Sequence, residues 1–75
     1  MPRIKLLGNA RKVVGSNIID LKINNIDDLI DMLKAKGISK EELLILVNGV
    51  ELSLIDNKEL DDNDIVTIAS IVHGG

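Results

Sequence analysis

The chain has 75 residues, a net charge of −3 at pH 7, no cysteine and no Phe, Tyr or Trp. This length makes one small domain with an aliphatic core, and the missing cysteines exclude disulfides, thiolate nucleophiles and Cys-based metal sites. The negative charge and the missing rings argue against nucleic-acid binding, and no apolar run approaches the ~20 residues that span a bilayer. We therefore expect a cytoplasmic protein, monomeric when free, that binds neither nucleic acid nor membrane.

Two strands and a loop are predicted at the start of the chain. Residues 3–6 and 19–23 alternate polar and apolar side chains with a period of two, as half-buried strands do. Gly8 interrupts the first pattern, and residues 11–16 are predicted to form a loop that closes at Gly15. Two strands joined by a short connection predict an antiparallel hairpin.

A helix follows. Asn25 is a suitable N-cap, and two aspartates in the first turn favour the positive end of the helix dipole. Ile26, Leu29, Ile30 and Leu33 form one apolar stripe at helical spacing, and Gly37 is placed to end the helix in the left-handed conformation.

The second half predicts one helical turn and three more strands. Ser39-Lys40-Glu41-Glu42 matches a capping box, and the continuous apolar run 43–47 predicts a strand buried on both faces. Asn48-Gly49 predicts a tight hairpin turn into a short strand over 50–52. A turn over 61–64 leads into a last strand, 65–68, that continues into Ile71-Val72. One helix across a small mixed sheet predicts an α+β domain of β-grasp (ubiquitin-like) type over residues 1–70.

The sequence ends in Gly74-Gly75, for which two interpretations stand. A backbone without side chains can enter a narrow slot, and its ionised carboxylate can attack phosphorus when a partner supplies an activated phosphate. Alternatively, the glycines are a disordered end without function. We expect residues 71–75 to form a flexible tail, which at ~3.3 Å per residue reaches roughly 16 Å.

Three segments together resemble the ubiquitin-like sulfur carriers: 46–51 (LVNGVE), 60–66 (LDDNDIV) and 72–75 (VHGG). That group includes the small subunit of molybdopterin synthase, the sulfur carrier of thiamine thiazole synthesis and the archaeal small modifier proteins. Ser70-Ile71 stands where many molybdopterin synthase small subunits have a proline pair. Asn63 stands where the family has a glycine, and Asn also tolerates a left-handed backbone.

The resemblance implies a carrier, not an enzyme, that binds no cofactor itself. Gly75 would be adenylated by an E1-like adenylyltransferase that consumes ATP, and then converted to a thiocarboxylate by a persulfide donor. Gly74 would allow close approach, with Ile71, Val72 and His73 as the stalk. A synthase or thiolase in molybdopterin or thiamine synthesis or in tRNA thiolation would then accept the sulfur.

A docking surface for the activating enzyme is predicted from the last strand. Both of its faces carry aliphatic side chains, and one helix can cover only one of them. We expect an exposed apolar patch with an acidic rim on this surface, and the alternative is that the acidic residues form a solubilising face. The predicted apolar residues are Ile68, Ile71, Leu52 and Leu54, and the predicted rim is Glu59, Asp61 and Asp62.

His73 and the aspartates of the late turn are weaker candidates for a functional site. His73 is either a solvated tail residue or a group that titrates at a partner's site. One histidine without cysteine makes no tetrahedral metal site, and Asp61, Asp62 and Asp64 lack the EF-hand spacing.

Two rival functions remain open. One is a protein modifier, in which activated Gly75 forms isopeptide bonds with lysines of other proteins. The other is a β-grasp interaction module that binds without using its terminus.

Overall fold

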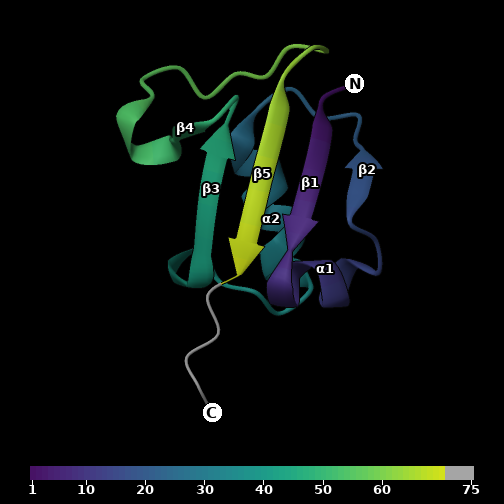
Figure 1. Cartoon of the computed structure of the whole chain (residues 1–75). Helices are drawn as coiled ribbons and strands as arrows, with labels where there is room; N and C mark the ends of the chain where they lie inside the picture. The colour runs from purple at the N-terminus through teal and green to yellow at the C-terminus, as the bar shows by residue number, and fades with distance from the viewer. Residues whose placement is uncertain (71–75) are drawn as a thin grey trace.

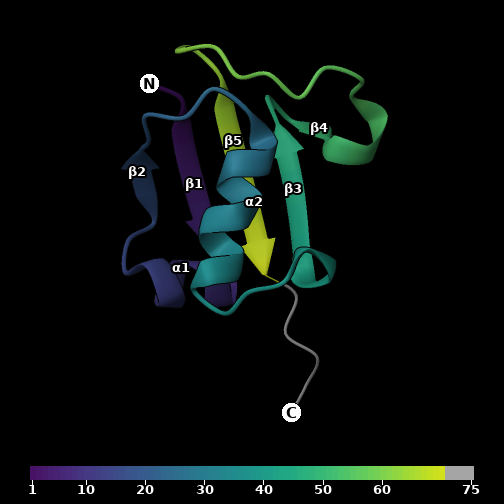
Figure 2. The same ribbon diagram turned by 180° about the vertical axis from the view of Figure 1, so that it is seen from behind.

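The computed structural model describes residues 1–70, which form a five-stranded mixed sheet with one long helix across one face (Figures 1 and 2). The strand order is β2-β1-β5-β3-β4, with β1 and β5 parallel in the centre and the other pairs antiparallel. This arrangement confirms the predicted β-grasp fold. The elements are β1 (Arg3–Leu7), α1 (Gly8–Val14), β2 (Ile18–Asp20), α2 (Ile26–Ala35), η1 (Lys40–Glu42), β3 (Leu43–Val47), β4 (Val50–Glu51), η2 (Leu52–Leu54) and β5 (Ile65–Ser70).

The β1–β2 hairpin is confirmed, but the predicted loop within it is wrong. Residues 8–14 form α1, which leaves β1 at Gly8 (φ +61°) and ends at Gly15 (φ +88°). Ala10 is fully buried and Val14 packs against the core, so the helix is held by an apolar pair at i, i+4 spacing. No side chain caps its start, which is why no start signal is visible in the sequence.

The predicted second strand is also shorter than expected. β2 covers Ile18–Asp20, whereas Leu21 and Ile23 lie beyond the strand and pack against the core.

The long helix α2 is confirmed at both ends. The Asn25 side chain accepts a hydrogen bond from the Asp28 amide at 2.9 Å. At the other end Gly37 has φ +93°, and the amides of Gly37 and Ile38 donate to Lys34 and Leu33 carbonyls at 3.0 Å. These paired bonds are the glycine-terminated C-cap that the sequence predicts. Ile26, Leu29 and Leu33 are fully buried under the helix.

Two details of η1 and β3 differ from expectation. The Ser39 hydroxyl donates to the Glu42 carboxylate at 3.1 Å, so the two side chains bond each other and do not cap each other's amides. β3 is not buried on both faces: Ile45 is buried, but Leu44 is 40% exposed. The reason is that α2 covers one face of the sheet and leaves the other open (Figure 2). Leu52, predicted within the following strand, begins η2.

The turns before β5 are fixed by asparagine and aspartate side chains. Asn48 and Gly49 have φ +51° and +83°, which confirms the predicted hairpin turn. Asn48 is the only non-glycine residue among residues 1–70 with positive φ, so Asn63 does not adopt the left-handed conformation that it could tolerate. The late turn is instead closed by the Asp64 amide, which donates to the Asp61 carbonyl at 3.1 Å.

The core lies between α2 and the sheet, and all of its fully buried large side chains are aliphatic apart from Pro2. No helix within residues 1–70 has the length and apolar character needed to cross a membrane.

Candidate functional site

The central strand β5 determines where the predicted tail begins. Its last residue, Ser70, pairs with Leu43 of β3 on one side and bridges to Gly8 on the other. Ser70 is therefore held by neighbours on both sides, directly before the five tail residues. The tail prediction itself, for Ile71, Val72, His73, Gly74 and Gly75, lies outside the described residues.

The backbone next to Ser70 is tightly packed. A Cβ atom on Gly8 would lie 3.2 Å from the Ser70 carbonyl oxygen, and the φ of +61° at Gly8 disfavours any other residue. The Ser70 side chain is 9% exposed, and its hydroxyl finds no hydrogen-bond partner within residues 1–70. Glycine at position 8 thus brings α1 directly against the end of β5.

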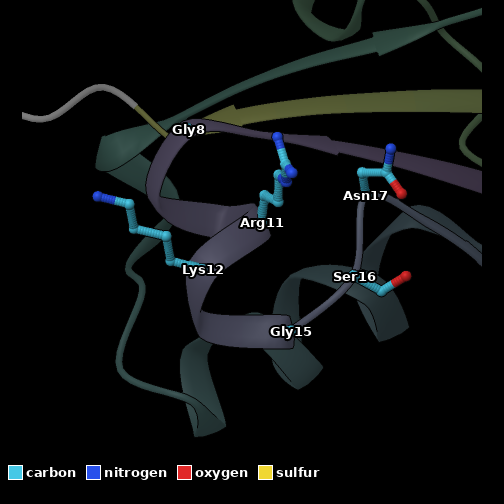
Figure 3. A pocket seen from close by; sticks show the side chains of 6 residues that line it. All are labelled: Gly8, Arg11, Lys12, Gly15, Ser16 and Asn17. Atoms are coloured by element: carbon cyan, nitrogen blue, oxygen red, sulfur yellow. The ribbon is translucent and has the colours of Figure 1, made fainter.

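A hollow of about 700 Å³ lies beside this junction, and Figure 3 shows its lining. Arg11 and Lys12 extend from α1 in different directions, and both side chains are exposed. Neither cation has a carboxylate within ion-pair distance among residues 1–70. Sequence reasoning missed this feature because it assigned 11–16 to a loop. The lining residues are Gly8, Arg11, Lys12, Gly15, Ser16 and Asn17.

The two faces of β5 are as the period-two pattern predicts, and this identifies the open face. Val66, Ile68 and Ser70 are buried on the α2 side, whereas Ile65, Thr67 and Ala69 lie on the other side. The assignment of Ile68 to the exposed docking patch is therefore wrong, because its side chain is fully buried in the core. The alternating pattern separates the two faces but does not say which one the helix covers.

An apolar row crosses the open face near the end of β5. Ala69 pairs with Leu7 of β1 on one side and with Leu44 of β3 on the other. Directly paired residues project to the same face, so the three side chains adjoin. Leu7 is 51% exposed and Leu44 is 40% exposed. We call Leu7, Ala69 and Leu44 the apolar row.

Leu52 and Leu54, which are also predicted docking residues, are not in this row, and Ile71 lies outside the described residues. Leu52 is half-buried and lines a groove of about 300 Å³ with Leu43 and Ile45. The Ile45 side chain is buried on the α2 side of the sheet, so this groove does not belong to the open face. Leu54 is 76% exposed in η2, outside the strands.

The residues of the predicted acidic rim lie near the start of β5, whereas the tail follows the end of this strand. Asp61 and Asp62 precede β5, where the Met1 amino group contacts Asp62 at 2.9 Å. Glu59 bridges to Asn25 at the start of α2. Figure 1 shows this loop at the end of the sheet opposite Ser70, so these carboxylates do not border the apolar row. Within residues 1–70, no three His, Cys, Asp or Glu side chains are grouped to hold a metal ion.

Asp64 fastens the start of β5. Its carboxylate accepts from the Asp61 amide at 2.7 Å and from the Asn48 side-chain amide at 2.9 Å. These two hydrogen bonds, the backbone one first, hold the pKa of Asp64 below its usual value, against a smaller effect of burial. Asn48 also accepts from the Ile65 amide at 2.9 Å. This network joins the two turns and gives Asp64 a structural role.

Comparison with known proteins agrees with this geometry. The profile of the ThiS family matches residues 4–75, which includes both terminal glycines. A search of curated proteins found no match.

Several solved structures share the fold. Urm1 of Sulfolobus solfataricus is 24% identical, with a TM-score of 0.76 over 93% of this chain and 100% of that one. Small archaeal modifier protein 1 of Methanosarcina acetivorans is 26% identical, with a TM-score of 0.71 over 99% and 95%. A chain of the BexX/CysO complex of Amycolatopsis orientalis is 21% identical, with a TM-score of 0.69 over the whole of both chains.

Proposed function

The chain belongs to the ThiS family, and we propose that it is a sulfur carrier whose Gly75 carboxyl group becomes a thiocarboxylate. The observation that carries this proposal is that the family match continues through Gly74 and Gly75. The fold adds a reason, because the central strand delivers the chain to one end of the sheet beside an exposed apolar row. The chain then acts as the substrate of other enzymes.

The chemistry takes place at one carboxyl group. A Gly75 carboxylate oxygen attacks the α-phosphorus of ATP on a partner enzyme, and pyrophosphate leaves. The terminal sulfur of a persulfide attacks the acyl carbon of the adenylate, and AMP leaves. A thiol then reduces the resulting acyl disulfide and releases the thiocarboxylate. Adenylation makes the carboxyl carbon reactive, since AMP leaves far more readily than an oxide ion.

The apolar row supports a revised docking surface for the adenylating enzyme. Leu7, Ala69 and Leu44 adjoin the end of β5, so an enzyme that receives residues 71–75 would meet this face first. Adjoining exposed apolar side chains next to the start of the tail are a surface that a protein partner can cover.

The test of the function is intact-mass spectrometry after incubation with the adenylating enzyme, ATP and a persulfide donor. We expect the mass gain of one oxygen replaced by sulfur. A variant without Gly75 and a variant with one residue added after it are the matched controls, and both should stay unmodified while folded. An unmodified wild-type chain, with an enzyme shown to be active on another carrier, would contradict the proposal.

A second candidate is a protein modifier, favoured by the 26% identity to small archaeal modifier protein 1 over 99% of this chain. In that case the activated Gly75 carbonyl is attacked by lysine amino groups of other proteins, with loss of AMP or of a carrier thiol. A tagged copy expressed in its host should then form conjugates that resist detergent and reductant. Branched lysines in tryptic peptides would identify the modifier, whereas a thiocarboxylate without conjugates would identify the pure carrier.

A further inference from the structure

The charges of the domain are divided between its two ends. The end where β5 begins carries the acidic turn 61–64, the start of α2 with Asp27 and Asp28, and Asp20 opposite Arg3. The end where β5 stops carries α1, the last turn of α2 and η1 (Figures 1 and 2). Five of the nine Lys and Arg side chains lie at this second end, and the carboxylates that residues 1–70 place among them are Glu41 and Glu42. The five cations are Arg11, Lys12, Lys34, Lys36 and Lys40.

The cations at this end are available to a partner. All five side chains are exposed, and within the described part of the chain none of them is ion-paired. The two ion pairs of that part, Met1–Asp62 and Arg3–Asp20, both lie at the other end. A protein of net charge −3 thus turns an unneutralised basic surface toward the side on which residues 71–75 begin.

Arg11 and Lys12 are the two cations of the helix that is bridged to Ser70, the last residue that the structure describes. They lie on α1, which Gly8 joins to Ser70 through a backbone bridge. The hollow beside them adds the Asn17 side chain, whereas the Ser16 hydroxyl already donates to the Ile18 carbonyl at 3.0 Å. The surface therefore offers separated, exposed cations and an amide side chain without a hydrogen bond inside residues 1–70, which suit several carboxylates spread over a partner surface.

We infer that the basic surface around Arg11 and Lys12 docks against an acidic surface of the adenylating enzyme, next to the opening that admits residues 71–75. The inference rests on the proposed function. An acidic protein is favoured over RNA as the occupant because Glu41 and Glu42 lie among the cations and no aromatic side chain is present for base stacking. Complementary charges at such a site speed encounter and orient the tail before the chemistry begins.

The test compares charge reversals at the two ends. Arg11→Glu/Lys12→Glu is the test pair, and Lys22→Glu/Lys58→Glu, exposed and away from α1, is the control with the same change in net charge. Adenylation is measured with the purified adenylating enzyme as pyrophosphate exchange over a series of salt concentrations. We expect the test pair to lower kcat/KM about tenfold at low salt through KM, with the difference shrinking as salt rises, and the control pair to change it less than twofold.

A neutral pair, Arg11→Gln/Lys12→Gln, tests whether the effect of the charge reversal comes from loss of the α1 fold. It should lower kcat/KM for adenylation less than the charge reversal does, and its circular dichroism should match that of the wild type. Equal rates for the wild type and the test pair at low salt would overturn the docking surface while leaving the proposed function intact. Equal losses in both reversal pairs would also overturn it, because net charge alone would then explain the effect. Binding to a tRNA that the test pair loses, with adenylation unchanged, would assign the surface to RNA. No adenylation of the wild-type chain would overturn both proposals.

Discussion

The two ends of β5 differ in the groups that surround them. Those at the start bond to one another and stabilise the fold, whereas those at the end remain available to a partner. At the start, Asn48, Asp61 and Asp64 exchange side-chain and backbone hydrogen bonds that join two turns into one unit. At the end, the neighbours are a glycine, an exposed apolar row and cations without ion pairs in residues 1–70. The polar groups at the start of β5 already hydrogen-bond one another, whereas the cations and the apolar row at its end are exposed and can contact a partner.

The largest expected effect separates the covered face of β5 from its open face. Ile68→Asp places a carboxylate in a fully buried position and should cost about 4 kcal/mol or more, which is comparable to the whole stability of so small a domain. We expect the variant to be unfolded by circular dichroism. Thr67→Asp, on the neighbouring open-face position, should stay folded with nearly the same urea midpoint. A folded Ile68→Asp variant would show that the faces are assigned wrongly.

The next effect is expected on binding and not on folding. Leu44→Asp introduces a charge into the apolar row and should lower kcat/KM for adenylation roughly thirtyfold, or about 2 kcal/mol. Leu54→Asp is the matched control, because Leu54 is more exposed but lies outside the row. Pyrophosphate exchange measures both variants. If Leu54→Asp impairs adenylation more than Leu44→Asp, the docking surface lies over η2 and not over the row.

The start of β5 was predictable from the sequence to a greater extent than its end. Asn-Gly turns, N-caps and glycine C-caps follow from local chemistry, so the hairpin and α2 were correctly predicted. The helix α1 was missed, because an uncapped seven-residue helix depends on the burial of Ala10 and Val14 rather than on local signals.

The docking residues required information that the sequence lacks. Which face α2 covers, and which end of β5 lies beside the acidic turn, are properties of the tertiary arrangement. Ile68 and the acidic rim were therefore misplaced, although the alternation along β5 was correct. The Gly75 prediction rests on the terminal glycines and the order of the motifs, and it stays a prediction because residues 71–75 lie outside the described residues.

A third prediction tests whether the start of β5 is held by side chains or by backbone conformation. Asn48→Gly keeps the positive φ and loses two side-chain hydrogen bonds, which should cost about 1–2 kcal/mol in urea unfolding. Asn48→Ala should cost about 1 kcal/mol more, because alanine is strained at positive φ. Asn63→Gly should not stabilise the domain, since Asn63 does not have positive φ. Equal stability of the Gly and Ala variants would show that the conformation contributes nothing.

The smallest expected effect is on how the free energy of unfolding changes with pH. Hydrogen bonds from Asp61 and Asn48 lower the pKa of Asp64 in the folded protein, so the folded state favours the ionised carboxylate more than the unfolded state does. This contribution to the free energy of unfolding is complete above the unfolded pKa, which the ordinary value of 3.8 approximates, and is lost as the pH falls through the lower folded pKa. Asp64→Asn should therefore lower stability at pH 7 and flatten its decrease below about pH 4, measured by urea unfolding from pH 2 to pH 7. Asp56→Asn is the control and should keep the wild-type slope, because the Asp56 carboxylate is exposed and makes no ion pair within residues 1–70. An unchanged slope in Asp64→Asn would mean that the acid sensitivity of the domain arises elsewhere, and the Asn48 bond to the Ile65 amide would then be the side-chain contribution that holds the start of β5.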